Sequence, residues 1–259
     1  MIKVFADHEV IEIRYPISDA FIISLRSPVE IPEILPGNFA EIQIKNITGV
    51  FLRRPFSILD VDYDSRVISF FIKIIGKGTG KLGEAQRGDK VSLIYPLGNS
   101  FTMPEPGKKV LIVGGGSGIA PFVMLGRNLK NNDNEVTFLT GGKSRKDVLT
   151  SALFSEFGEI YTTTEDGSSG EKGFVTDHSI LNSESLHFDK IYSCGPDAMM
   201  KAVGKIANRH KINCEVSLEN MMACGFGACL CCATETIEGN KRVCKEGPVF
   251  NVNYLKWQI

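Results

Sequence analysis

The chain has 259 residues, enough for two domains and a small third unit. Its formal net charge of −1 gives no bulk attraction to nucleic acid, and its 43% hydrophobic content is ordinary for a globular protein. No apolar run reaches the roughly 18 residues that a membrane-spanning helix needs, and charge appears too early for a secretory signal. We therefore expect a cytoplasmic protein with neither nucleic acid nor membrane as a partner.

The first hundred residues are rich in segments of strand length. Apolar or alternating runs cover residues 10–14, 20–25, 39–44 and 67–73, with Gly, Pro, Asn and Asp between them. Many short strands with regular turns predict a small antiparallel β-barrel.

Two motifs in this part suggest a phosphate-containing cofactor. Residues 54–57, Arg-Pro-Phe-Ser, combine a cation, a restricted proline and a hydroxyl in one short strand. Residues 76–80, Gly-Lys-Gly-Thr-Gly, offer backbone N–H groups beside a hydroxyl, which suits a phosphate. In isolation, a solvated surface charge and a flexible turn are the better explanations.

Together, and in this order, the two motifs resemble the FAD domain of the ferredoxin reductase family. The resemblance implies that Arg54 pairs with the FAD pyrophosphate and that Ser57 bonds near the isoalloxazine, with Pro55 and Phe56 completing the motif. It also implies further FAD contacts from a second strand and from the glycine–threonine pair: Phe71, Ile72, Lys73, Gly78 and Thr79.

The pattern changes at residues 104–107, Pro-Glu-Pro-Gly, which we take as a domain boundary. A buried-strand run at 109–113 is followed by a glycine-rich loop and an amphipathic stretch at 122–129. Strand, loop and helix together predict a nucleotide phosphate site, because glycines let a pyrophosphate approach the helix N-terminus. The residues expected to bind are Gly115, Gly116, Ser117 and Gly118.

This loop departs from two standard patterns. Pro121 stands where G-x-G-x-x-G has its last Gly or Ala, and no Gly-Lys-Ser/Thr ends the loop as in a P-loop. A simple turn at the start of a helix is the alternative.

Further strands at 136–140 and 190–193 alternate with helical stretches at 147–157 and 197–210. This alternation predicts an α/β layer with a parallel sheet. The strand at 190–193 leads into Cys194, Gly195 and Pro196, and the ferredoxin reductase resemblance implies that this motif lies by the nicotinamide. A small buried hydrophobe is the alternative for Cys194.

Two charged segments point to opposite cofactors. The basic run at 143–146 could hold the 2′-phosphate of NADP, whereas Glu165 and Asp166 suit the ribose hydroxyls of NAD.

The most specific signal is a run of cysteines near the end of the chain. Cys224, Cys229, Cys232 and Cys244 are spaced C-x4-C-x2-C-x11-C, and the first three match the plant-type spacing for a [2Fe-2S] cluster. Small residues at 225, 227 and 228 leave room for backbone N–H groups to approach cluster sulfurs. Zinc is the main rival, because four thiolates also suit Zn²⁺. Cys231 does not fit the spacing, and a register shift to C-x4-C-x-C is the alternative.

The whole chain, and residues 218–229 most specifically, resembles the electron-transfer subunit of bacterial class 1B dihydroorotate dehydrogenase. The resemblance implies FAD, a [2Fe-2S] cluster and NAD as cofactors. It implies an FMN-containing catalytic subunit as partner, in a heterotetramer of pyrimidine biosynthesis. Electrons would pass from dihydroorotate, through this chain, to NAD. Cys231 and the basic run at 143–146 depart from the family pattern.

We therefore predict three domains: an FAD-binding β-barrel at 1–103, an NAD-binding α/β domain at 104–214 and a [2Fe-2S] domain at 215–259. No acid–base constellation stands outside the cofactor motifs, so no catalytic residue is assigned. One alternative is an NAD(P)H:ferredoxin-type reductase subunit of a bifurcating transhydrogenase or soluble hydrogenase. A cluster-bearing scaffold without activity is another.

Overall fold

The computed structural model describes residues 2–183 and 186–257, which form two compact units. The first unit takes in the chain up to Ser100 together with residues 220–234 and 241–248. The second holds residues 101–219, residues 235–240 and the chain from Val249 onward. The C-terminal segment thus contributes to both units, and the cysteine-rich part of it belongs with the first.

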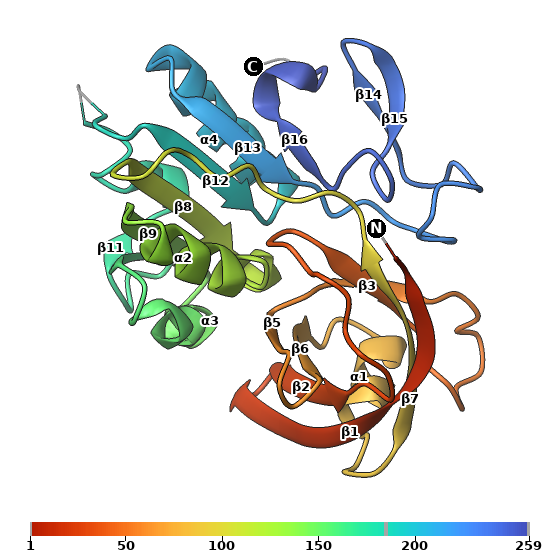
Figure 1. The fold of residues 1–259 in the computed structure, drawn as a ribbon. Helices are drawn as coiled ribbons and strands as arrows, with labels where there is room; N and C mark the ends of the chain where they lie inside the picture. The colour runs from red at the N-terminus through yellow and green to blue at the C-terminus, as the bar shows by residue number, and fades with distance from the viewer. Residues whose placement is uncertain (1, 184–185, 258–259) are drawn as a thin grey trace. The chain divides into compact units, whose positions relative to one another are not determined.

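The first unit is built on one seven-stranded antiparallel sheet (Figure 1). The strand order is β4-β3-β7-β1-β2-β6-β5. The bounds are β1 (Val4–Ile17), β2 (Ala20–Arg26), β3 (Phe39–Ile42), β4 (Arg54–Ser57), β5 (Asp60–Asp62), β6 (Val67–Lys73), β7 (Lys90–Leu97) and a short helix α1 (Lys77–Gly83). The antiparallel part of the predicted fold class is confirmed.

The central strands of this sheet supply the hydrophobic core of the first unit. From Ala20 to Leu25, every residue of β2 is buried, because the strand lies between β1 and β6. Phe21, Ile23 and Phe70 have no exposed surface, and burying each such side chain stabilises the fold by about 1.5–3 kcal/mol. The edge strand β4, in contrast, has only half-buried residues.

The second unit contains a seven-stranded, mostly parallel sheet in the order β11-β10-β9-β8-β12-β13-β16. The strand bounds are β8 (Lys109–Gly115), β9 (Glu135–Gly142), β10 (Glu159–Thr164), β11 (Glu171–Lys172), β12 (Lys190–Cys194), β13 (Asn213–Ser217) and β16 (Val249–Asn251). Only β16 runs antiparallel to its neighbour within the described sheet. Two further strands, β14 (Ala233–Thr236) and β15 (Gly239–Arg242), form a separate hairpin.

The connectivity of the parallel sheet creates a switch point. From β8 the chain moves outward to β9 and β10, and then returns to form β12 on the other side of β8. The helices α2 (Phe122–Asn131) and α4 (Asp197–Arg209) pack against β9 and against β12 and β13, respectively (Figure 1). In open α/β sheets, ligands bind at the carboxyl ends of the strands where the order reverses. The predicted α/β layer is confirmed, and the switch point lies between β8 and β12.

One predicted helix is different in the structure. Residues 147–157 were expected to be helical, but the chain forms a four-residue helix, α3 (Arg145–Val148), and then a 3₁₀ segment (Leu149–Phe154). Thr150 and Ser151 fall in this stretch, and both residue types have low intrinsic helix propensity. Among the helices of the described chain, none combines the length and the apolar character needed to cross a membrane.

Candidate functional site

The four cysteines with cluster spacing meet in the first unit as two pairs of thiols. The side chains of Cys224 and Cys229 are hydrogen-bonded to each other, and so are those of Cys232 and Cys244. The backbone N–H of Cys244 also donates to Sγ of Cys232 at 3.4 Å. No three His, Cys, Asp or Glu side chains of residues 2–183 and 186–257 converge as a site for a single metal ion. The loop therefore offers paired sulfurs, with four thiolates in all for a cluster.

The backbone of this loop stabilises the thiolate form of Cys224. Burial alone would raise the pKa of the Cys224 thiol, but the N–H groups of Phe226, Cys229 and Ala228 aim at its sulfur and lower the pKa to about 6. The Ala228 nitrogen lies 3.3 Å from Cys224 Sγ. Gly225 and Gly227 have φ values of 74° and 92°, which L-residues rarely adopt. N–H groups aimed at sulfur and thiolate character both fit an iron–sulfur cluster.

Cys231 lies outside both pairs. It is exposed, and its Sγ is 3.7 Å from the carbonyl oxygen of Met221, whereas Cys232 is only 2% exposed. These positions support Cys232 as the third ligand and argue against the shifted register.

The predicted flavin strand is the edge strand β4. Strand β3 covers one side of it, pairing Phe39 with Ser57 and Ile42 with Arg54. An edge strand presents unpaired backbone groups and tolerates a proline such as Pro55. Strand β4 therefore offers half-buried side chains and an open edge to a ligand.

The two neighbouring arginines have different tasks. Arg53 donates to the carbonyl of Ser92 and to its hydroxyl, both at 2.9 Å, so it is committed to the sheet. Arg54 donates only through Nη1 in the bonds that the structure defines, to the carbonyls of Leu52 and Arg53. Arg54 is thus the arginine of this pair that can turn to an anion.

The other predicted flavin residues are less accessible. Phe71 and Ile72 are 4% and 1% exposed, and Lys73 forms an ion pair with Asp19 at 3.5 Å. The Thr79 hydroxyl accepts from the N–H groups of Ile75 and Gly76, and caps α1. Any contact of Phe71, Ile72 or Thr79 with a cofactor would therefore depend mainly on backbone atoms.

In the second unit, the glycine loop and the Cys-Gly-Pro motif meet at the switch point. A Cβ on Gly118 would lie 2.3 Å from the carbonyl oxygen of Cys194, and one on Gly115 would lie 3.0 Å from Cδ of Pro196. Gly195 has a φ of 144°, and a Cβ on it would lie 2.9 Å from the carbonyl oxygen of Gly115. Glycine is therefore required where the two motifs touch. Gly116, with a φ of 59°, has no neighbour within 4 Å of its Cβ position and faces open space.

Cys194 is a buried, neutral thiol. Burial raises the pKa of the Cys194 thiol well above its usual range. Its Sγ lies 3.9 Å from Oε1 of Glu219, which follows β13. Glu219 was not predicted from the sequence, although its place just after a strand beside β12 puts it at the same sheet edge.

The two charged segments considered for cofactor choice are neighbours in space. The basic run follows β9 and the acidic pair follows β10, and these strands are adjacent. The N–H of Asp166 donates to the carbonyl of Lys143, and the N–H of Arg145 donates to the hydroxyl of Ser168 at 2.7 Å. Both segments therefore lie side by side at the carboxyl ends of adjacent strands.

Two residues that were not predicted from the sequence, Arg242 and Glu41, contact the cysteine loop. Arg242 donates through Nη1 to the carbonyl of Gly227 at 3.0 Å and is paired with Glu246. The Arg242 guanidinium lowers the pKa of the Glu246 carboxyl to about 2. Glu41 of β3 is buried against Gly225, with its Cγ 2.4 Å from the Cβ position of that glycine.

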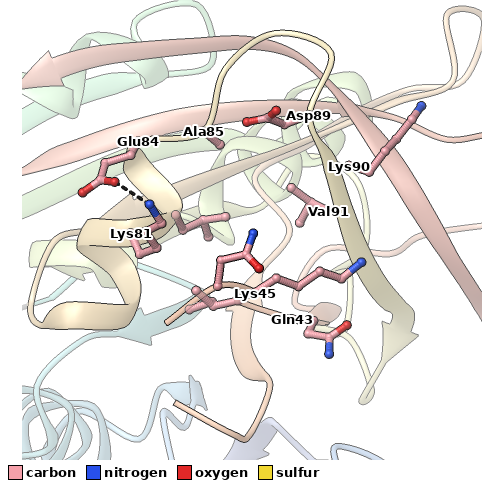
Figure 2. A pocket seen from close by; sticks show the side chains of 11 residues that line it. Gln43, Lys45, Lys81, Glu84, Ala85, Asp89, Lys90 and Val91 are labelled. Atoms are coloured by element: carbon pink, nitrogen blue, oxygen red, sulfur yellow. Dashed lines mark hydrogen bonds and ion pairs between the residues drawn. The ribbon is translucent and has the colours of Figure 1, made fainter. Parts of the chain in front are cut away.

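A separate cavity of about 310 Å³ opens on the first unit near α1 (Figure 2). Charged side chains of both signs surround it, and Lys81 pairs with Glu84 at 2.8 Å. Its lining residues are Gln43, Ile44, Lys45, Asn46, Lys81, Leu82, Glu84, Ala85, Asp89, Lys90 and Val91. None of these belongs to a predicted cofactor motif.

A curved antiparallel sheet, a parallel sheet with a glycine loop at its switch point and a paired-cysteine loop together define a class. It is the ferredoxin reductase type of oxidoreductase, here with an added iron–sulfur segment. Residues 112–205 match the family model of an oxidoreductase NAD-binding domain, and residues 219–256 match that of the iron–sulfur cluster binding domain of dihydroorotate dehydrogenase B.

Relatives that align with most of the chain identify the family within this class. The dihydroorotate dehydrogenase B (NAD(+)) electron transfer subunit of Clostridium acetobutylicum is 40% identical over 84% of this chain and 85% of its own. That of Desulforamulus reducens is 34% identical over 100% of both chains. The chain belongs to the family of dihydroorotate dehydrogenase B electron transfer subunits.

Solved structures agree on the fold. The NADH-dependent reduced ferredoxin-NADP oxidoreductase, studied for flavin-based electron bifurcation, matches with a TM-score of 0.87 and 28% identity over 97% of this chain and 90% of its own. The ferredoxin reductase of carbazole 1,9a-dioxygenase matches with a TM-score of 0.70 at 24% identity, over 82% and 67%. The predicted oxidoreductase class, the electron-transfer role and the cofactors FAD, NAD and an iron–sulfur cluster are confirmed by these comparisons.

Proposed function

We propose that this chain carries electrons between an FMN-containing dihydroorotate dehydrogenase catalytic subunit and NAD, within a heterotetramer of pyrimidine biosynthesis. Family membership supports the catalytic partner, because the relatives are named as subunits of that enzyme. We expect the complex in the cytoplasm, where reducing conditions keep cysteines available as metal ligands.

One observation carries the proposal. The cysteine loop packs on β3, and β3 pairs with the predicted flavin strand β4. Glu41 of β3 touches Gly225 of the loop and lies opposite Pro55 of β4. A cluster and a flavin held at these two places would be separated by a single strand of the same compact unit, which suits electron transfer between them.

Each group of residues has a defined task in this proposal. Arg54 anchors the FAD pyrophosphate. The flavin ring system rests on the edge formed by Pro55, Phe56 and Ser57. Further contacts with FAD come from Phe71, Ile72, Lys73, Gly78 and Thr79. The NAD pyrophosphate binds to the loop formed by Gly115, Gly116, Ser117 and Gly118. The nicotinamide is positioned by Cys194, Gly195 and Pro196. Cys224, Cys229, Cys232 and Cys244 hold a [2Fe-2S] cluster. When bound, the nicotinamide exchanges a hydride, the flavin can pass its two electrons singly, and the cluster carries one electron.

The test is reconstitution of the complex. The purified chain should reduce ferricyanide with NADH but should not oxidise dihydroorotate. Adding the FMN-containing catalytic subunit should produce dihydroorotate:NAD activity and a complex whose mass fits two copies of each subunit. Turnover of dihydroorotate by the isolated chain, or no binding of that subunit at micromolar concentration, would refute the proposal.

A second candidate is a reductase subunit that exchanges electrons with a ferredoxin-type carrier. The match to the NADH-dependent reduced ferredoxin-NADP oxidoreductase over 97% of this chain favours it. It would be the better assignment if reduced ferredoxin, and not the catalytic subunit, restored turnover. The absence of flavin absorption near about 450 nm from the purified protein would instead favour a cluster scaffold over both candidates.

A further inference from the structure

Glu41 is a buried carboxyl that none of the roles above uses. It lies in β3, its exposed fraction is 0%, and neither carboxyl oxygen has a hydrogen-bond partner among the described residues. Buried polar groups are nearly always hydrogen-bonded, so an exception calls for an explanation. An apolar side chain of the same size would avoid the desolvation cost at this position.

The nearby cation does not explain Glu41. Arg53 lies close enough to influence the carboxyl, but its guanidinium donates to the carbonyl and hydroxyl of Ser92. It also donates to the backbone carbonyl of Glu41, at 3.3 Å, and not to the carboxyl. Arg53 thus links the backbones of neighbouring strands and does not neutralise the Glu41 carboxyl through a hydrogen bond.

The carboxyl faces the cysteine loop. A Cβ on Gly225 would lie 2.4 Å from Cγ and 2.9 Å from Oε1 of Glu41, so the glycine backbone rests directly on the carboxyl. Gly225 adopts a φ of 74° and follows Cys224, the first proposed ligand. Within the sheet, Glu41 is paired with Pro55 of the neighbouring strand β4, the proposed flavin strand. Glu41 is therefore the contact between that pair of strands and the first turn of the cluster loop.

We propose that Glu41 is a positioning residue, whose carboxyl supports Gly225 and thereby fixes the orientation of Cys224 toward the cluster. This inference rests on the proposed function, because it takes Cys224 as a cluster ligand. The orientation of a ligand and the polar groups around it tune the electronic properties of a metal site. Glu41 is expected to influence the reduction potential of the cluster without touching it.

The test compares two substitutions of similar size. Glu41→Leu keeps the bulk but removes the polar atoms, whereas Glu41→Gln keeps both the shape and the polar atoms. Gln43→Leu, two residues further along and exposed, is the matched control. For each variant the measurements are iron and FAD per chain, the EPR g-values of the reduced cluster, and its midpoint potential from a reductive titration.

We expect Glu41→Leu to retain FAD but to shift the g-values and the midpoint potential beyond experimental error. Glu41→Gln and Gln43→Leu should match the wild type. A Glu41→Leu protein with wild-type g-values and potential would overturn the inference. Equal shifts in Glu41→Gln and Glu41→Leu would also overturn it, because the carboxylate charge would then be the cause. If Glu41→Leu does not fold, as judged by loss of FAD, Glu41→Met provides the same comparison.

The same experiment separates this inference from the proposed function. A wild-type chain that binds FAD but shows no iron–sulfur EPR signal would refute the cluster assignment itself. A wild-type cluster that is insensitive to Glu41→Leu would refute only the role of Glu41.

Discussion

Cys231 and Cys232 are adjacent in the chain but lie in different surroundings. Cys232 is buried and its thiol is hydrogen-bonded to that of Cys244, whereas Cys231 is exposed and contacts a backbone carbonyl. What the four proposed ligands share is a second thiol beside each, because Cys224 is paired with Cys229 as Cys232 is with Cys244.

We therefore expect the two cysteines to respond differently to serine. Replacing Cys224, Cys229, Cys232 or Cys244 singly should remove or strongly perturb the cluster. Cys231→Ser, Cys194→Ser and Cys214→Ser should each keep about two iron atoms per chain. Iron analysis and the visible spectrum of the purified variants provide the measurement. Loss of iron in Cys231→Ser together with retention in Cys232→Ser would mean that the shifted register is correct.

Arg53 and Arg54 are likewise adjacent in the chain but lie in different surroundings. The guanidinium of Arg53 donates hydrogen bonds to Ser92 within the sheet. Arg54 lies on the edge strand, and only its Nη1 donates in the bonds that the structure defines, so it can donate to a ligand. A charge-assisted hydrogen bond to a phosphate contributes about 1.5–3 kcal/mol.

Arg54→Ala should accordingly weaken FAD binding by roughly tenfold to a hundredfold. The measurement is a titration of the flavin-free protein with FAD, followed by fluorescence. Arg87→Ala, which removes an exposed arginine from a loop of the same unit, is the control and should leave the affinity unchanged. Equal FAD affinities for Arg54→Ala and the wild type would contradict the assignment.

At the scale of elements, the proposed nucleotide site depends on the close approach of β8 and β12. The loop after β8 and the motif after β12 touch through glycine, with the Cβ position of Gly118 only 2.3 Å from a backbone oxygen. No flexible side chain can yield there, so a methyl group must push the two elements apart.

Gly118→Ala should therefore raise the KM for NADH by about tenfold or more, which corresponds to about 1.4 kcal/mol. FAD and iron contents should stay at wild-type values, because those sites belong to the first unit. Steady-state kinetics with ferricyanide as the acceptor provide the measurement. A KM within twofold of the wild-type value would show that the glycine loop does not bind the nucleotide.

The loops after β9 and β10 bear on the choice between NADH and NADPH. The Asp166 carboxylate is held by the N–H and hydroxyl of Ser168, which lower its pKa and keep it charged. A fixed carboxylate accepts ribose hydroxyls and repels a 2′-phosphate.

We predict that kcat/KM is higher for NADH than for NADPH, and that Asp166→Ala reduces this ratio by about tenfold through loss of the ribose bond. Lys146→Ala is the informative counterpart. If the basic run held a 2′-phosphate, this variant would lose NADPH activity selectively. A wild-type ratio that favours NADPH would reject the prediction.

At the scale of the whole molecule, the proposed cofactor sites are divided between the two units. The proposed nucleotide motifs lie in the second unit, and the proposed flavin strand and the cysteine loop share the first. In the proposed relay the cluster is the last carrier before the catalytic subunit, so its loss should affect only reactions that involve that partner.

Cys229→Ala tests this order, because Cys229 is the exposed residue among the four proposed ligands and its replacement removes no buried side chain. NADH:ferricyanide activity should remain within about twofold of the wild type, since the flavin can be oxidised directly by the dye. Dihydroorotate:NAD activity with the catalytic subunit should fall by at least about a hundredfold. A parallel loss of both activities would place the cluster between NADH and the flavin.

Much of this architecture was determined by local patterns. The spacing of the cysteines, the glycine loop after a buried strand and the strand-rich first hundred residues each reflect short-range chemistry, and they predicted the confirmed fold class and the iron–sulfur cluster. FAD and NAD were implied by the family resemblance. The helix predicted at 147–157 is the exception. The structure has the four-residue helix α3 and then a 3₁₀ segment there, and the stretch includes Thr150 and Ser151, residue types of low helix propensity.

What the sequence determined is therefore which motifs are present and what ligands they suit. Only the tertiary structure decided which of them meet. It brought Gly118 against Cys194, assigned Arg53 to the sheet and left Arg54 at the edge, and buried Glu41 under Gly225 although about 180 residues separate them in the chain. Such contacts depend on strand order and on chain reversal between distant segments, and the local periodicity of a sequence carries no record of either.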